Sequence, residues 1–276
     1  MRAGSVSSSF SSSARRFSMC LESASYCAFC SCSFGPHGIE VWRPFTLAER
    51  WALRGARRVF FVSDYTRREL LKRCPLPAGR AVVLPNALDP AFPIAAVPVG
   101  EGAPVILVVT RLTHPDRYKG VDHLIAAMPA IRAALPDVTL RIVGRGDDLP
   151  RLQTLRNRLG LRSAVEFLGY VDDRRLAAEF AACRLFALPS EREGFGLVFL
   201  EAMASGRPCL GANAVGIPEV ITADTGMLAE FGDVPGLAAA AVTALRRTWD
   251  QEAILARARH FSYSQFKAHL ASLRSA

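Results

Sequence analysis

The chain has 276 residues, half of them apolar, which is enough for a sizeable core in one or two domains and excludes a wholly disordered protein. No apolar run reaches the roughly 18 residues that a membrane-spanning helix needs, so we do not expect an integral membrane protein. The formal net charge of +9 is concentrated near the start, because residues 37–80 hold ten Lys or Arg against four acids and residues 81–276 hold 21 against 20.

The opening segment, residues 1–36, contains twelve Ser and four Cys and shows neither helical nor strand periodicity. Its Arg- and Ser-rich, acid-poor composition is similar to that of a transit peptide, whereas Ser and Cys interrupt every apolar stretch that a signal peptide would need. We assign it no fold and expect low-complexity, disordered sequence.

Seven cysteines bear on metal binding and on the cellular compartment. Cys27, Cys30 and Cys32 with His37 offer four potential zinc ligands, but their spacing fits no usual pair of ligand knuckles, so no metal site is predicted. The three later cysteines lie among apolar neighbours and are predicted to be reduced, buried thiols of a cytosolic protein: Cys74, Cys183 and Cys209.

From Val59 onward, short apolar or β-branched runs alternate with segments of helical periodicity. In segment 120–135, for example, the apolar residues recur at spacings of three and four, which predicts a helix with one face on a sheet. Right-handed crossovers between such units give an α/β fold with a parallel, doubly wound sheet. The predicted strands are 59–62, 81–84, 105–109, 140–143, 165–168, 185–188 and 209–211, and the predicted helices are 64–73, 120–135, 149–159, 172–182 and 196–205.

A proline-rich segment, residues 85–102, is predicted to connect two domains. The part that follows, residues 99–260, is long enough for a complete Rossmann-like domain, whereas residues 37–98 are too few. Ligands of doubly wound sheets bind at the carboxyl ends of the strands, so we expect the functional residues in the loops that follow the strands.

Two cations stand in the first such loop of the larger part. Arg111 follows a predicted strand and Lys119-Gly120 precedes the next helix, so a guanidinium and an ammonium group would lie on one side of the crevice and suit a diphosphate. Two solvated surface charges are the alternative. The turn Gly144-Arg145-Gly146 lacks the third glycine of the G-x-G-x-x-G pattern, where Leu149 stands, so an NAD site is not supported.

The most informative segment is Glu193-Gly194-Phe195-Gly196, which lies between a strand that ends at Leu188 and a predicted helix. Backbone N–H groups at that helix start would face a phosphate. Glu193 and Glu201, with seven residues between them, offer carboxylates that accept hydrogen bonds from hydroxyls such as those of a sugar and a ribose. Exposed acids favoured by the helix dipole are the alternative, which suits Glu193 and explains Glu201 poorly.

In order and spacing, these elements together with Gly216-Ile217-Pro218-Glu219 resemble the retaining glycosyltransferases of family 4, which have the GT-B architecture. The resemblance implies that Arg111 and Lys119 bind the donor diphosphate, that Glu193 contacts the donor sugar as a catalytic carboxylate and that Glu201 contacts the ribose. It implies a UDP- or GDP-linked sugar as substrate, no cofactor and no metal, and the sequence contains no Asp-x-Asp. The other candidate donor-binding residues are Gly120, Gly144, Tyr170, Val171, Gly194, Phe195 and Gly196.

The resemblance extends outside this domain. His37-Gly38 is similar to the strand end that carries the active-site His of the family, so His37 is a candidate catalytic residue, with an ordinary turn His as the alternative. Residues 261–276 resemble the terminal helix that crosses back to the first domain, and their apolar face would need a surface to cover.

The start of the chain departs from the family pattern, since only residues 1–36 stand where about half a Rossmann domain is expected. We interpret the chain as a truncated or frame-shifted member that retains, in residues 37–98, a remnant of the N-terminal Rossmann-like acceptor domain and a linker. Such a remnant would leave an unpaired, apolar sheet edge at 39–41 or 59–62.

The sequence thus predicts a metal-independent, cytoplasmic hexosyltransferase, or its donor-binding part, that acts with retention on a glycan or lipid-linked hydroxyl. A truncated, inactive nucleotide-sugar-binding fragment or a partner-dependent half is the alternative. The basic residues of 37–80 match no nucleic-acid motif, so no nucleic-acid partner is predicted. They would suit peripheral contact with an anionic inner membrane face.

Overall fold

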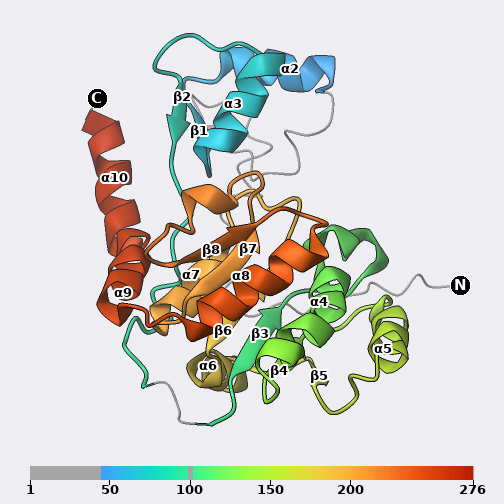
Figure 1. Cartoon of the computed structure of the whole chain (residues 1–276). Coiled ribbons are helices and arrows are strands. Elements are labelled where there is room, and N and C mark those ends of the chain that lie inside the picture. The colour runs from blue at the N-terminus through green and yellow to red at the C-terminus, as the bar shows by residue number, and fades with distance from the viewer. Residues whose placement is uncertain (1–44, 99–101, 276) are drawn as a thin grey trace, which may run out of the picture.

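The computed structural model describes residues 45–98 and 102–275, which form a small unit and a large unit (Figure 1). The segment 1–36, the candidate His37 and the predicted edge at 39–41 lie outside the described residues.

The small unit contains two helices and two strands: α2 (Leu47–Gly55), β1 (Val59–Phe61), α3 (Asp64–Arg73) and β2 (Ala81–Val83). Both helices begin with a capping box, in which Thr46 and Ser63 accept hydrogen bonds from the third helical N–H group of α2 and α3. β1 and β2 pair in parallel. A small core of its own holds the unit together, made of Phe45, Leu53, Ala56, Val59, Phe61, Leu70 and Cys74.

The large unit is built on six parallel strands in the order β5-β4-β3-β6-β7-β8, which confirms the predicted doubly wound sheet. The chain starts in the middle, runs outward to one edge and then returns to the middle, so the strand order reverses between β3 and β6. The strands are β3 (Val105–Val109), β4 (Thr139–Val143), β5 (Val165–Gly169), β6 (Leu185–Leu188), β7 (Cys209–Ala212) and β8 (Gly226–Ala229).

Helices cover both faces of this sheet. α4 (Val121–Ala134) and α8 (Val234–Arg246) pack together on one face, with α5 (Leu149–Arg158) beside α4 (Figure 1). The crossovers of the returning half place α6 (Asp173–Ala182) and α7 (Leu197–Ala204) on the other face, where α9 (Gln251–His260) packs on α7. Short 3-10 turns follow β3 and β7, namely η3 (His114–Lys119) and η4 (Ile217–Glu219).

The connector between the units is tied to the large unit. The fully buried side chain of Arg207 donates hydrogen bonds to the carbonyl oxygens of Val97, at 3.0 Å, and Phe180, at 3.2 Å. These bonds join the connector to the end of α6, and burial lowers the pKa of Arg207. The three predicted thiols, Cys74, Cys183 and Cys209, are free and buried as expected.

The C-terminal segment differs in one respect from the prediction. Phe261 ends α9 instead of opening the terminal helix, α10 (Tyr263–Ser275). The Leu88 N–H donates to the Phe261 carbonyl at 2.9 Å, so the connector meets the chain where α10 starts. That α10 crosses back to the first domain stays a prediction. Across residues 45–98 and 102–275, no helix combines the length and the hydrophobicity needed to cross a bilayer.

A substitution at Gly144 tests how closely the loops after β3 and β4 approach each other. Its φ is 146°, and a Cβ atom there would overlap the Thr110 carbonyl oxygen. We predict that Gly144→Ala lowers the free energy of unfolding by about 3 kcal/mol, because the clash is with main chain that cannot rotate away. Gly160→Ala is the control, since φ is 68° there and nothing lies within 4 Å. Gly160→Ala should lower the free energy of unfolding by only about 1 kcal/mol, the cost of a left-handed conformation at a residue with a side chain. Urea denaturation measures both variants, and equal losses of unfolding free energy in the two would contradict the clash at Gly144.

Candidate functional site

The loops that follow β3 and β6 meet where the strand order reverses, which is the position at which doubly wound sheets bind ligands. Lys119, the last residue of η3, forms an ion pair with Glu193 from the β6–α7 loop. Only 13% of the lysine side chain and 19% of the glutamate side chain are exposed. A backbone bond of 2.8 Å from the Glu191 N–H to the Tyr118 carbonyl joins the same two loops. The fold therefore brings together two predicted site residues that are 74 positions apart.

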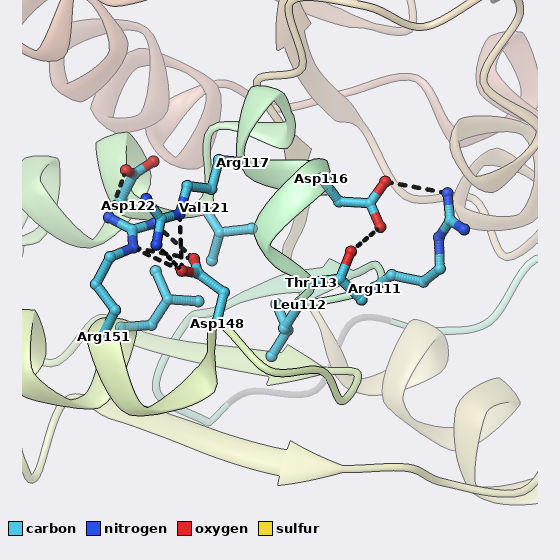
Figure 2. A pocket seen from close by; sticks show the side chains of 10 residues that line it. Arg111, Leu112, Thr113, Asp116, Arg117, Val121, Asp122, Asp148 and Arg151 are labelled. Atoms are coloured by element: carbon cyan, nitrogen blue, oxygen red, sulfur yellow. Dashed lines mark hydrogen bonds and ion pairs between the residues drawn. The ribbon is translucent and has the colours of Figure 1, made fainter. Parts of the chain in front are cut away.

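Arg111, just beyond β3, is held by a buried carboxylate. Its guanidinium donates to Asp116 (Figure 2), at 3.0 Å. Half of the Arg111 side chain is exposed. Asp116 is 6% exposed and also accepts hydrogen bonds from the hydroxyls of Thr113, at 2.6 Å, and Tyr118, at 3.3 Å. Asp116 thus fixes the direction of Arg111 while leaving part of the cation accessible.

Two of the predicted glycines precede helices at this crevice and have backbone conformations that favour glycine. Gly120 has a φ of 69° and begins α4, and a Cβ atom there would overlap the Pro189 carbonyl of the β6 loop. Gly196 has a φ of 85° and begins α7, and a Cβ atom there would lie 2.6 Å from a ring carbon of Phe199. Both positions need the left-handed conformation and the missing side chain of glycine.

The turn that follows β7 also contacts the β6–α7 loop. The Gly216 N–H donates to the Glu193 carbonyl at 3.2 Å, and a Cβ atom on Gly216 would overlap the Gly194 carbonyl. Val215 before it has a φ of 55°, which is strained for a β-branched residue. The family resemblance includes Gly216 but assigns it no role, whereas in the structure this turn supports Glu193.

Tyr170 and Val171 follow β5, on the β3–β4–β5 side of the crevice. The Tyr170 ring is half exposed, and the Arg145 guanidinium lies 5.1 Å from its centroid. This side offers a flat aromatic surface beside the Gly144 turn. Phe195 is different, because its ring is 4% exposed and packs edge-on against Phe261 at 5.3 Å. Only the backbone of Phe195 is therefore available to a ligand.

Glu201 lies in the middle of α7 and is half-buried. Burial raises its pKa to about 7, and the negative charges of Asp173 and Asp89 raise it further in the same direction. The carboxyl group is thus divided between its neutral and ionised forms near neutral pH. The neutral form donates one hydrogen bond and the ionised form only accepts.

A second ion network ties η3 to the start of α5. Asp148, which is 4% exposed, accepts hydrogen bonds from Arg117, at 2.8 Å, and Arg151, at 2.7 Å (Figure 2). Arg151 also donates to Asp122 at 2.9 Å. Burial alone would raise the pKa of Asp148, but the bonds from Arg151 and Arg117 outweigh it and lower that pKa. This network and Arg111 line one small cavity, and the sequence pattern did not reveal the network because its members come from separate helices.

Because the pKa of Glu201 is raised in the folded chain, we predict that the stability of the fold depends on pH. Between about pH 4.5 and pH 7 the folded chain retains the proton that the unfolded chain releases, so this group lowers stability as pH rises through that window. Glu201→Gln should therefore raise the free energy of unfolding by about 1–3 kcal/mol at pH 8 and by little at pH 4.5. Urea denaturation at both pH values measures it, with the exposed Asp137→Asn as control. A gain that is equal at the two pH values would contradict the raised pKa.

Comparison with known proteins places this geometry in a family. Residues 103–247 match the glycosyl transferases group 1, and residues 30–92 match the Glycosyltransferase Family 4. N-acetyl-alpha-D-glucosaminyl L-malate synthase of Bacillus anthracis is 36% identical over 58% of this chain and 42% of its own length. A GDP-mannose-dependent alpha-(1-6)-phosphatidylinositol monomannoside mannosyltransferase of Mycolicibacterium smegmatis is 33% identical over 74% of this chain and 58% of its own. The chain spans about half the length of these relatives.

Solved structures give the same result. HepE of Anabaena, determined with UDP and glucose, superposes with a TM-score of 0.71 and 25% identity over 88% of this chain and 71% of that protein. The lipopolysaccharide outer core galactosyltransferase WaaB shares the fold, with a TM-score of 0.72 and 19% identity over 94% of this chain and 80% of that one. Together with the family match over more than half of the chain, these findings show that it belongs to the family 4 glycosyltransferases, of GT-B fold.

Proposed function

We propose that the crevice between the β3 and β6 loops binds a nucleotide-diphospho-sugar and serves the transfer of its hexose to a hydroxyl of a glycan or glycolipid, with retention of configuration. The observation that carries the proposal is the meeting of Lys119 with Glu193 where the strand order reverses. It places a cation suited to a diphosphate beside a carboxylate suited to sugar hydroxyls.

The charges of the site suggest how binding and transfer would proceed. In the structure, Lys119 is paired with Glu193 and Arg111 with Asp116. A diphosphate would attract both cations, and a displaced Glu193 would be able to accept hydrogen bonds from the sugar. In the transition state the two cations would stabilise the charge that builds up on the departing diphosphate. The acceptor oxygen would then bond to the anomeric carbon on the face that the diphosphate leaves, and the hydroxyl proton would pass to the departing phosphate oxygen, without an enzyme-bound sugar.

The relatives support the donor and acceptor classes of this proposal. One is named for GDP-mannose and a phosphatidylinositol mannoside, and another was solved with UDP and glucose. A UDP- or GDP-linked sugar and a glycan or lipid-linked acceptor are therefore the proposed substrates, with Tyr170 and Val171 near the base and no cofactor. His37 is proposed as a catalytic residue on the acceptor side.

We also propose peripheral contact with an anionic inner membrane face, for which α2 is the candidate surface. Leu47 and Trp51 lie one helical turn apart and are 86% and 74% exposed. Exposed arginines accompany them at Arg50 and Arg54. An apolar pair flanked by cations is the arrangement with which interfacial helices bind anionic lipid.

The donor site is tested by calorimetric titration of the purified chain with UDP and GDP. We expect one nucleotide to bind and the Arg111→Ala/Lys119→Ala variant to lose at least about a hundredfold in affinity, since two charge-assisted contacts are removed. Arg158→Ala/Arg162→Ala removes the same charge from exposed positions at and just beyond the end of α5, outside the site, and should bind normally. Unchanged affinity in the first variant would reject this site. A sugar-transfer assay on the same samples tests the proposed transfer step.

The membrane surface is tested by co-sedimentation with vesicles of neutral lipid alone and of neutral lipid mixed with phosphatidylglycerol. We expect binding to the mixed vesicles only, with a loss of at least about tenfold in Leu47→Ser/Trp51→Ser, because two apolar side chains no longer enter the interface. Salt should weaken the binding. Leu159→Ser, which alters an exposed leucine on the large unit, is the control. Equal binding of all variants, or none to any vesicle, would refute this contact.

A further inference from the structure

One carboxylate joins the two units at a helix start. Both oxygens of Glu219, the last residue of η4, accept hydrogen bonds of 2.7 Å from the backbone N–H groups of Asp64 and Tyr65. These are the first two residues of α3, whose N–H groups have no acceptor within their own helix. A carboxylate at this end of a helix is also favoured by the helix dipole.

We propose that Glu219 is a positioning residue that holds the small unit against the donor loop, and we call its contact with Asp64 and Tyr65 the Glu219 clasp. The clasp itself is a structural claim. Its effect on sugar transfer rests on the proposed function.

The segment that carries Glu219 is anchored directly to the donor loop. Three residues before it, the Gly216 N–H donates to the Glu193 carbonyl. On its other side, Arg257 from α9 donates hydrogen bonds to the carbonyl oxygens of Glu219 and, at 3.1 Å, of Val220. Because η4 is a single short turn fixed at both ends, a shift of the donor loop at Glu193 would be transmitted to Glu219. The clasp thus connects the sugar side of the site to α3.

The charges around the clasp favour it. The Asp64 side chain would repel the Glu219 carboxylate if it were unpaired, but it forms ion pairs with Arg67 and, at 2.9 Å, with Arg68 of its own helix. Arg67 and Arg68 therefore neutralise the Asp64 carboxylate, while the backbone N–H group of Asp64 donates to Glu219. This explains how two acids at the same helix start are compatible.

The clasp predicts that the two units contribute to different steps, the large unit to donor binding and the small unit to transfer. Donor affinity depends on Arg111 and Lys119 in the large unit, whereas transfer also needs the small unit to face the donor sugar. Loss of the clasp should therefore lower kcat and leave nucleotide affinity nearly unchanged, which a general loss of folding would not do.

Amide hydrogen exchange followed by NMR tests the clasp directly. In the unmodified chain the Asp64 and Tyr65 amides should be protected, and Glu219→Ala should accelerate their exchange roughly tenfold to a hundredfold. The Leu70 and Leu71 amides inside α3 should keep their protection, which shows that the helix stays folded. Asp224→Asn removes an equal charge from an exposed site five residues away and should change nothing. Equal exchange at Asp64 and Tyr65 with and without Glu219 would overturn the clasp.

Asp64→Pro tests the other side of the contact. Proline is tolerated at the first helical position, and Ser63 before it is extended, with φ −151° and ψ 159°, as a residue before proline prefers. This variant deletes one of the two donated N–H groups, and its control Asp64→Ala keeps the N–H while removing the same side chain. We expect faster Tyr65 exchange in Asp64→Pro than in Asp64→Ala.

Two measurements on Glu219→Ala, amide exchange and kcat, separate the clasp from the proposed function. The exchange measurement needs no substrate, so it stands even if UDP and GDP fail to bind. If the nucleotide binds and sugar is transferred, Glu219→Ala should lower kcat at least about tenfold with nucleotide affinity within about twofold of the unmodified chain. Faster exchange with unchanged kcat would overturn the positioning role.

Discussion

The reversal of strand order between β3 and β6 is the constraint on which the rest of the structure depends. The helices that directly follow β3 and β6, α4 and α7, cover opposite faces of the sheet, so the loops after these two central strands diverge and leave a crevice between them. The Lys119–Glu193 ion pair spans that crevice. Gly120 and Gly196, which precede α4 and α7, both have positive φ values, and at Gly120 the missing side chain lets the start of α4 approach the Pro189 carbonyl of the opposing loop.

The charges of the site fall into two sets that differ in what they contact. Asp148 and Asp116 are nearly fully buried and are held by several donors each, so they fix η3 and Arg111 in place. Lys119 and Glu193 have each other as partners in the structure. Breaking a mostly buried pair is costly unless new charges replace the lost partner, and a diphosphate with a sugar beside it would provide such a replacement.

Sequence patterns predicted the large unit well and the contacts across it poorly. Strands Val105–Val109 and Leu185–Leu188 and helix α3 have the predicted bounds, because buried runs and helical periodicity are local signals. The helices α2, α8 and α9 were missed. Glu219 is 155 residues from Asp64 along the chain, and only the folded structure brings the pair together. The candidate residues Arg111, Lys119, Glu193 and Gly120 were found from motif spacing, whereas their supports Asp116, Asp148 and Val215 were not.

The most direct measurement of the central claim is a crystal structure of this chain with a bound nucleoside diphosphate. The account predicts that the diphosphate lies between the β3 and β6 loops, that the Lys119 ammonium group contacts a phosphate oxygen, and that Glu193 has turned from the lysine toward the space for the sugar. A diphosphate bound elsewhere, with the Lys119–Glu193 pair intact, would contradict it.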